Sequence, residues 1–320
     1  MKKRMITGLV LGLILIPFLL FSNVTVFCVG VIIPVIIASY EMIRMFKDKQ
    51  ELSLPVKIIC IILVLLAYVS IVGLWCNMSG VDSYFESESV FKFFNSIYTY
   101  CNITVILMVL SLIVLALTIF VKEFDSECAG RLFLIILYVA LGFGSLSILR
   151  IIGKRLLIYL FIVTIFTDVF AYFSGMLFGK HKLTPISPKK TWEGSIGGTL
   201  VATVFGSLFA LNYDVIMNLI TKIPAFENEE LYDSIFQTVC DIPSRGLEVF
   251  TIICITLFTS IIGQIGDLVS SKMKRDNGIK DFSNIFPGHG GVLDRFDSAI
   301  YAAMFLVAIL TFLKCAYPAL

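Results

Sequence analysis

Long apolar runs dominate the chain, and short polar stretches separate them. A membrane-spanning helix needs about 20 mostly apolar residues. Nine runs approach that length: residues 5–22, 24–40, 56–76, 103–121, 131–149, 156–178, 195–212, 247–268 and 298–317. The connections between them leave little room for a separate soluble domain. The pattern predicts an all-α integral membrane protein with about nine transmembrane helices.

Composition and charge support the same class of protein. The chain is 58% hydrophobic and only 15% charged, whereas a soluble domain is about half apolar and a quarter charged. Its formal net charge is +2, far from the strongly basic balance of a nucleic-acid binder. We therefore expect the lipid bilayer as the chain's environment and no nucleic-acid partner.

The distribution of Lys and Arg predicts the orientation. Most of the 25 basic residues fall in connections on the same side as the N-terminus, and basic connections remain cytoplasmic. We expect a cytoplasmic N-terminus in a bacterial cytoplasmic membrane, with an organelle left open. Arg150, Lys154 and Arg155 fall on the outer side. Either they bind anionic headgroups there, or the fifth and sixth spans are misplaced.

Residues 270–297 form a polar connection with unusual chemistry, SSKMKRDNGIKDFSNIFPGHGGVLDRFD. About a third of these residues are charged. Three glycines surround His289 in the GHGG stretch, namely Gly288, Gly290 and Gly291. They would let the backbone approach a ligand and offer N–H groups to anions. Asp294 and Asp297 share a face at the start of the last helix, which suits a divalent cation with oxygen ligands.

A stripe of polar residues approaches the same region from the eighth predicted span. Its members recur at helical spacing: Ser260, Gln264, Asp267, Ser271 and Lys274. In the sixth span, Asp168 and Tyr172 also share one face. Ionisable residues at membrane depth are costly and usually functional. We expect Asp168 to line the same polar cavity as Asp267, the alternative being an isolated acid with a structural partner.

The second charged connection reads GKHKLTPISPKKTWEGSIGG. Ser187 followed by Pro188 suits a helix N-cap and first helical position, so Lys189 and Lys190 would lie beside free N–H groups that bind an anion. The alternative is an ordinary helix start with two interfacial lysines. Gly194 and Gly198, four residues apart, predict close helix packing.

These motifs together resemble the signature of phosphatidate cytidylyltransferases, also called CDP-diacylglycerol synthases. The signature is Ser271-x-Met273-Lys274-Arg275, then Lys280-Asp281, then Pro287-x-His289-Gly290-Gly291-x-x-Asp294-Arg295-x-Asp297, and every fixed position is filled. The stretches at 263–267, 187–194 and 168–175 resemble that family in order and spacing. The resemblance covers about residues 150–317. We therefore expect five spans in residues 1–150 and a catalytic membrane region in residues 151–320.

The resemblance implies a reaction in which CTP and phosphatidic acid give CDP-diacylglycerol and pyrophosphate. It implies Mg²⁺, with a second cation left open, a homodimer, and an active site on the cytoplasmic side. We assign Asp267, Asp294 and Asp297 to the metal. The candidates for the triphosphate are Lys274, Arg275, Lys280, His289 and Arg295, and those for either substrate's phosphate are Ser187, Lys189, Lys190, Gly290 and Gly291. Asp168, Tyr172 and Gln264 would line the polar cavity, and Asp281 could also pair with Lys280 or Arg275.

Two other functions fit parts of the sequence. A CTP-dependent enzyme acting on an isoprenoid lipid, either a cytidylyltransferase or a polyprenol kinase, would share the charged motifs. A transporter could use Asp168 and Asp267 as coupling-ion sites. A transporter would place polar residues near the middle of several spans, whereas most charge here lies in connections and at helix ends.

Overall fold

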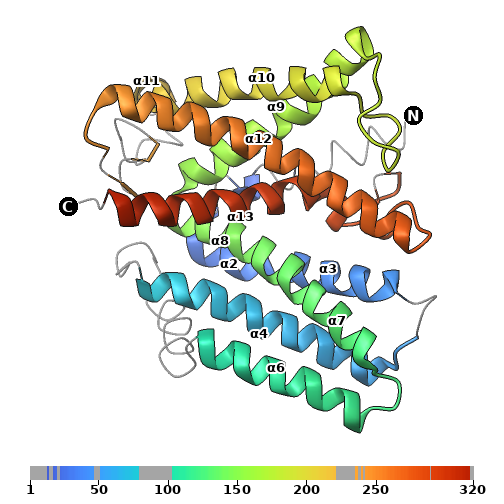
Figure 1. Ribbon diagram of the computed structural model, residues 1–320. Coiled ribbons are helices and arrows are strands. Elements are labelled where there is room, and N and C mark those ends of the chain that lie inside the picture. The colour runs from blue at the N-terminus through green and yellow to red at the C-terminus, as the bar shows by residue number, and fades with distance from the viewer. Residues whose placement is uncertain are drawn as a thin grey trace. The chain divides into compact units, whose positions relative to one another are not determined.

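The computed structural model describes residues 13, 17–19, 22–46, 51–78, 103–220, 235–236, 239–240, 242–288 and 290–317. In chain order the helices are α2 (Val24–Gly30), α3 (Ile32–Met45), α4 (Leu54–Met78), α6 (Ile103–Phe120), α7 (Ser126–Ile135), α8 (Leu141–Ile152), α9 (Lys154–Phe178), α10 (Trp192–Leu211), α11 (Tyr213–Ile220), α12 (Arg245–Asp276) and α13 (Leu293–Ala316) (Figure 1). One π-helical turn, Ile136–Ala140, joins α7 to α8. The described residues form isolated β-bridges but no strand, so the predicted all-α class is confirmed.

Seven stretches of the described residues are long and apolar enough to cross a membrane: Val24–Met45, Leu54–Gly73, Ser126–Ile152, Lys154–Phe178, Trp192–Leu211, Arg245–Asp276 and Leu293–Ala316. Every predicted span after the first coincides with a helix, although the apolar part of α6, Val105–Phe120, is shorter than the others. The predicted span at 5–22 lies largely outside the described residues. The count of nine and the cytoplasmic N-terminus stay predictions.

The chain divides into two compact units. Unit 1 comprises Met1–Ile151 and Lys272–Phe296, and unit 2 comprises Ile152–Ser271 and Asp297–Leu320. The boundary that we placed after residue 150 is a division by function and stays a prediction. The structure differs in grouping residues 272–296, which hold most of the signature, with the N-terminal helices.

In unit 1, α4 packs against both α3 and α6. The buried Tyr68 of α4 ties three helices together, since its hydroxyl donates to the Cys28 carbonyl at 2.9 Å and lies 2.8 Å from the Ser147 hydroxyl of α8. A buried phenol keeps its hydrogen bonds because an unpaired polar group in an apolar core is costly. The N-terminal helices therefore form a core with specific polar contacts.

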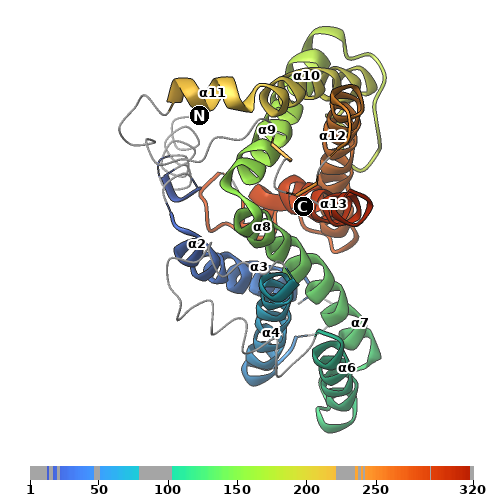
Figure 2. The same cartoon turned by 90° about the vertical axis from the view of Figure 1, so that its left-hand side faces the viewer.

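In unit 2, α9 and α10 run side by side (Figure 1, Figure 2). Glycines of α10 make this close approach possible. A Cβ on Gly198 would lie 2.5 Å from the Thr167 carbonyl oxygen, and one on Gly194 would lie 2.6 Å from the Ala171 carbonyl oxygen. The predicted role of Gly194 and Gly198 in close helix packing is confirmed.

The polar stripe of α12 faces α9 and α10 in the same unit. Ser260 is 1% exposed, and its hydroxyl lies 2.7 Å from that of Thr167. Gln264 donates to the Thr199 hydroxyl at 2.7 Å and accepts from the Ser195 hydroxyl at 2.6 Å. Interhelical hydrogen bonds of this kind help to hold helices together where lipid gives no hydrophobic driving force.

The basic residues near position 150 have an explanation that the sequence did not suggest. Arg150 and Arg155 are 7% and 4% exposed, and they donate to the carbonyl oxygens of Ser22 and Ile235 at 2.5 and 2.8 Å, respectively. Helices α8 and α9 are distinct, with Gly153 between them. For these two arginines both predicted alternatives, headgroup binding and misplaced spans, are wrong, because their guanidinium groups serve as internal donors.

We predict that Gly198→Ala destabilises unit 2. The added methyl would meet backbone atoms of α9, which cannot rotate away as a side chain can. Overpacking of this kind costs about 1–3 kcal/mol, so the thermal unfolding midpoint of the purified protein in detergent should fall. The matched control is Gly130→Ala in α7, where nothing lies within 4 Å of the added Cβ. A Gly198→Ala protein as stable as this control would contradict the packing argument.

Candidate active site

A turn closed by hydrogen bonds leads into α10. Leu183 donates its N–H to the Lys190 carbonyl at 2.9 Å, and Lys190 donates to the Ser187 carbonyl at 3.0 Å. The N-cap of α10 is Thr191, whose hydroxyl accepts from the Gly194 N–H at 3.1 Å. The prediction that Ser187 caps a helix beginning at Pro188 is therefore wrong. Residues 187–190 form their own turn, and the helix begins one turn later.

Lys190 emerges from this turn and forms an ion pair with Asp267 of α12. Both side chains are 27% exposed. The other carboxylate oxygen of Asp267 lies 3.5 Å from the Ser271 hydroxyl, one turn along the helix. The structure thus links two motifs that lie about 77 positions apart, the SPKK turn and the polar stripe of α12.

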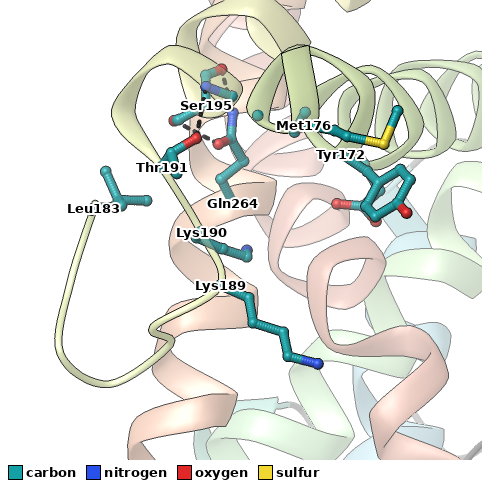
Figure 3. A pocket seen from close by; sticks show the side chains of 12 residues that line it. Tyr172, Met176, Leu183, Lys189, Lys190, Thr191, Ser195 and Gln264 are labelled. Atoms are coloured by element: carbon teal, nitrogen blue, oxygen red, sulfur yellow. Dashed lines mark hydrogen bonds between the residues drawn. The ribbon is translucent and has the colours of Figure 1, made fainter. Parts of the chain in front are cut away.

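Lys190 lines a pocket of about 340 Å³ in unit 2 (Figure 3), whereas Asp267 and Ser271 are not among the pocket's lining residues. Its polar lining includes Asp168, Lys189, Lys190, Ser195 and Gln264, and its other lining residues include Ala171, Tyr172, Met176 and Leu183. In Figure 3, the lysines extend from the turn and the Tyr172 and Met176 side chains lie together across the pocket. Asp168, Tyr172 and Gln264, predicted to line one polar cavity, all line this pocket.

Helices α12 and α13 approach closely at Gly266. A Cβ there would lie 2.9 Å from the Asp297 carbonyl oxygen and would meet Tyr301. Asp267 follows Gly266 directly, so the contact brings the backbones of Asp267 and Asp297 near each other. Asp297 is 8% exposed, and one of its oxygens accepts from the Ser298 N–H at 2.8 Å. No described contact joins the two carboxylates, so their joint role as oxygen ligands of Mg²⁺ stays a prediction.

In unit 1, the signature segment folds around Asp294. One carboxylate oxygen accepts from the Lys274 ammonium at 2.6 Å, and the other accepts from the N–H groups of Phe282 and Gly291, each at 2.9 Å. The side chains of Lys274 and Asp294 are 9% and 5% exposed. Lys274 also lies over the Phe282 ring, 5.1 Å from its centre. Asp294 therefore already has three donors, and as a metal ligand it would exchange some of them.

Two of the three glycines of the GHGG stretch are required by the conformation of the loop. Gly288 and Gly290 have φ values of 79° and 85°, in the region that favours glycine. The N–H of Gly290 donates to the Phe286 carbonyl at 3.1 Å, and that of Gly291 donates to Asp294. Both amides are thus used inside the loop, and the assignment of Gly290 and Gly291 to a substrate phosphate stays a prediction.

The remaining basic candidates of this segment lie at its surface. Arg275, Lys280 and Arg295 are exposed, and Arg275 donates to the Ile279 carbonyl at 3.0 Å. Asp281 is exposed too, and among the described contacts it pairs with neither Lys280 nor Arg275. His289 lies outside the described residues. The described residues include no group of three His, Cys, Asp or Glu side chains close enough to hold a metal ion, so the joint metal site of Asp267, Asp294 and Asp297 stays a prediction.

One residue of this region escaped the sequence reasoning. Glu41 of α3 is completely buried, and its carboxylate accepts from the Ser283 hydroxyl at 2.5 Å and from the N–H groups of Val292 and Leu293 at 2.9 and 3.0 Å. The only signal in the sequence is an acid near the end of an apolar run. Such a residue is ordinarily read as an interfacial charge.

Comparison of the sequence with known proteins identifies the family of the chain. The model of the cytidylyltransferase family matches residues 2–313. A phosphatidate cytidylyltransferase of Bacillus subtilis (strain 168) is 32% identical over 316 residues, covering 97% of each chain. Proteins of the same name from Staphylococcus haemolyticus (strain JCSC1435) and Staphylococcus aureus (strain COL) are each 30% identical over 312 residues, covering 97% of this chain and 99% of theirs.

We predict that Lys274→Met destabilises the protein far more than Lys272→Met. The first change leaves the buried Asp294 carboxylate without its cation, which costs about 3–5 kcal/mol. The second removes the cation of an exposed pair with Asp276 on the same helix, which is worth about 0–1 kcal/mol. Thermal unfolding of the substrate-free protein in detergent measures both. Equal midpoints for the two variants would show that the Asp294 pair contributes no more than a surface pair.

Proposed function

The chain belongs to the cytidylyltransferase family, and on that premise we propose that it transfers the cytidylyl group of CTP to phosphatidic acid, giving CDP-diacylglycerol and pyrophosphate. The observation that carries the choice of a lipid substrate is the pocket of unit 2. Its lysines can bind a phosphate, while Ala171, Met176 and Leu183 offer an apolar wall. The pocket opens among apolar helices of spanning length. A phosphate attached to a hydrocarbon chain fits such a lining better than a fully soluble anion does.

The reaction requires little acid–base chemistry from the protein. The second pKa of a phosphomonoester is about 6, so the phosphate of the lipid is already largely ionised near neutral pH. One of its oxygens attacks the α-phosphorus of CTP, the bond from that phosphorus to the bridging oxygen breaks, and pyrophosphate leaves. Positioning and charge neutralisation therefore supply most of the catalysis.

Charged residues on the described helices and loops are suited to those tasks. Lys189 and Lys190 line the pocket and would hold the phosphate of the lipid. Lys274, Arg275, Lys280 and Arg295, together with His289, are our candidates for the triphosphate and the departing pyrophosphate. The exposed Arg275, Lys280 and Arg295 would offset the negative charge of CTP, whereas Lys274 would first have to leave its buried pair with Asp294.

Mg²⁺ is the cofactor that we propose for this reaction, and it would supply charge neutralisation at the phosphates. Asp267 and Asp297, at the contact of α12 and α13, are the residues we expect to hold it. Asp294 is a third candidate, and a second cation is left open. Because Lys190 already pairs with Asp267, we expect that lysine to move toward a phosphate when the metal binds.

The setting of the reaction follows from the membrane fold. The protein is a multi-pass membrane protein: it has several apolar helices of spanning length, and it is related to bacterial phosphatidate cytidylyltransferases. We propose that its active site faces the cytoplasm, where CTP is available, and that two copies associate as a homodimer. Support for the first point is the concentration of basic residues in the connections that carry the motifs. Support for the second is the family resemblance alone.

The decisive test is incorporation of radiolabelled CTP into lipid by purified protein in detergent–phospholipid micelles. Label should enter the lipid fraction only when phosphatidic acid and Mg²⁺ are both present, with one pyrophosphate released for each label incorporated. Label entering an isoprenoid phosphate instead, or phosphate transfer to a polyprenol, would reassign the substrate. Inactivity with all of these lipids would overturn the proposed activity.

We predict that Asp297→Asn lowers kcat by about 100-fold or more, as loss of a group that stabilises transition-state charge does. The asparagine keeps the shape of the side chain, so the fold should persist and the unfolding midpoint should change little. Binding of Mn²⁺, followed by electron paramagnetic resonance, should weaken in parallel. Asp276→Asn removes an exposed carboxylate from the end of α12 and serves as the control. Unchanged Mn²⁺ binding in Asp297→Asn would remove this residue from the metal site.

A further inference from the structure

Glu41 occupies an unusual place for an acidic residue. It lies in α3, within a stretch long and apolar enough to span a membrane, and it is 0% exposed. Burying a carboxylate is costly unless hydrogen bonds replace its water. Each of its two oxygens has at least one donor, and all three described donors belong to residues 283–293. A residue near the beginning of the chain is thus bound to a loop about 250 positions away.

The donors identify what Glu41 does to that loop. Leu293 is the first residue of α13 and Val292 precedes it. The first N–H groups of a helix have no partner inside the helix, and a negative charge beside them is favoured by the helix dipole. Glu41 therefore acts as the cap of α13, supplied by another helix. The Ser283 hydroxyl binds the same carboxylate and fixes the start of the loop relative to its end.

The last glycine of the GHGG stretch is explained by the same carboxylate. A Cβ on Gly291 would lie 2.6 Å from the Glu41 carboxyl carbon and in contact with both of its oxygens. Gly291 has no positive φ value, unlike Gly288 and Gly290. The absence of a side chain at 291 is therefore required by the proximity of Glu41 and not by the backbone conformation.

We infer that Glu41 is a positioning residue for the reaction: it sets where α13 begins and so directs Asp294 and Arg295. This inference rests on the proposed function only for its catalytic consequence. Asp294 and Arg295 follow the capped residues Val292 and Leu293 directly. A change in the first turn of α13 would move both side chains, and a displacement of about 1 Å at a reacting group can cost about 100-fold in rate.

The test compares Glu41→Gln with Glu123→Gln. The glutamine keeps the size of the side chain, but its NH₂ group faces backbone N–H donors and cannot accept from them. Glu123 is a matched control in the same unit, since its carboxylate accepts from the Ser53 N–H at 2.8 Å, outside the signature segment. We expect Glu41→Gln to lower kcat by about 10–100-fold with little change in KM for CTP, and Glu123→Gln to leave both unchanged.

Hydrogen exchange gives a readout that does not depend on activity. Val292 and Leu293 donate to different oxygens of Glu41, and glutamine keeps one of them. The amide that then faces the NH₂ group should exchange about tenfold faster in Glu41→Gln, because it loses its buried acceptor. Amides in the middle of α13 should keep their protection. Wild-type exchange at 292 and 293 in this variant, or a kcat like that of the control, would overturn the inference. Inactivity of the wild-type protein would count against the proposed function and leave the exchange result valid.

A pair of changes tests the contact directly, even if Glu41→Gln folds poorly. Gly291→Ala alone should speed amide exchange at 292 and 293 and lower kcat strongly, because the methyl overlaps the Glu41 carboxylate that accepts from these amides. Adding Glu41→Asp withdraws the carboxylate by one methylene and should restore part of the activity, so the double variant should be more active than Gly291→Ala alone. Losses that simply multiply would show that the two residues are independent and would also overturn the inference.

Discussion

Two buried carboxylates at the start of α13 organise the segment that carries the signature. Asp294 accepts from the backbone at 282 and 291, and Glu41 accepts from the backbone at 292 and 293. A loop of this polarity cannot enter a core unless its N–H groups find acceptors. The two carboxylates supply these acceptors, and the Lys274 ammonium offsets one of the charges. The loop therefore has a defined shape before any substrate arrives, which reduces the ordering that binding would require.

The second organising feature is the polar stripe of α12. Ser260 and Gln264 of the stripe form hydrogen bonds with neutral side chains of α9 and α10, Thr167 and Thr199 respectively. Further along α12 the stripe reaches Asp267, which has a charged partner, Lys190, from the turn before α10. Hydroxyl and amide pairs hold helices together without a net charge, whereas Asp267 carries a charge and is 27% exposed. The same helix thus changes from neutral hydrogen bonds to an ion pair within two turns.

Hydropathy was enough to predict the helices, because the bilayer requires long apolar runs whatever the tertiary contacts are. Spacing was enough to predict that Asp168 and Tyr172 share a face of α9, because side chains four residues apart lie on one side of a helix. Spacing does not relate Gln264 of α12 to them; that expectation came from the cost of polar groups at membrane depth. Glu41 could not be predicted, since its partners lie about 250 positions away and only the fold brings them together. The cap of α10 was misassigned because Ser187 and Thr191 both suit that position, and tertiary contacts of the turn decide between them. The arginines at 150 and 155 looked like surface charges because a sequence does not show which backbone carbonyls are unpaired.

The two lysine–carboxylate pairs differ in their exposure to solvent, and this difference decides which role each pair can play. The Lys190–Asp267 pair is about a quarter exposed on both sides, while the Lys274–Asp294 pair is almost completely buried. Breaking a buried pair leaves an uncompensated charge and costs several times more than breaking one near the surface. Asp267 can therefore exchange its lysine for a cation at a smaller cost than Asp294 can. On this ground we propose Asp267 ahead of Asp294 as a metal ligand, and we propose that Asp294 serves first the architecture of the loop.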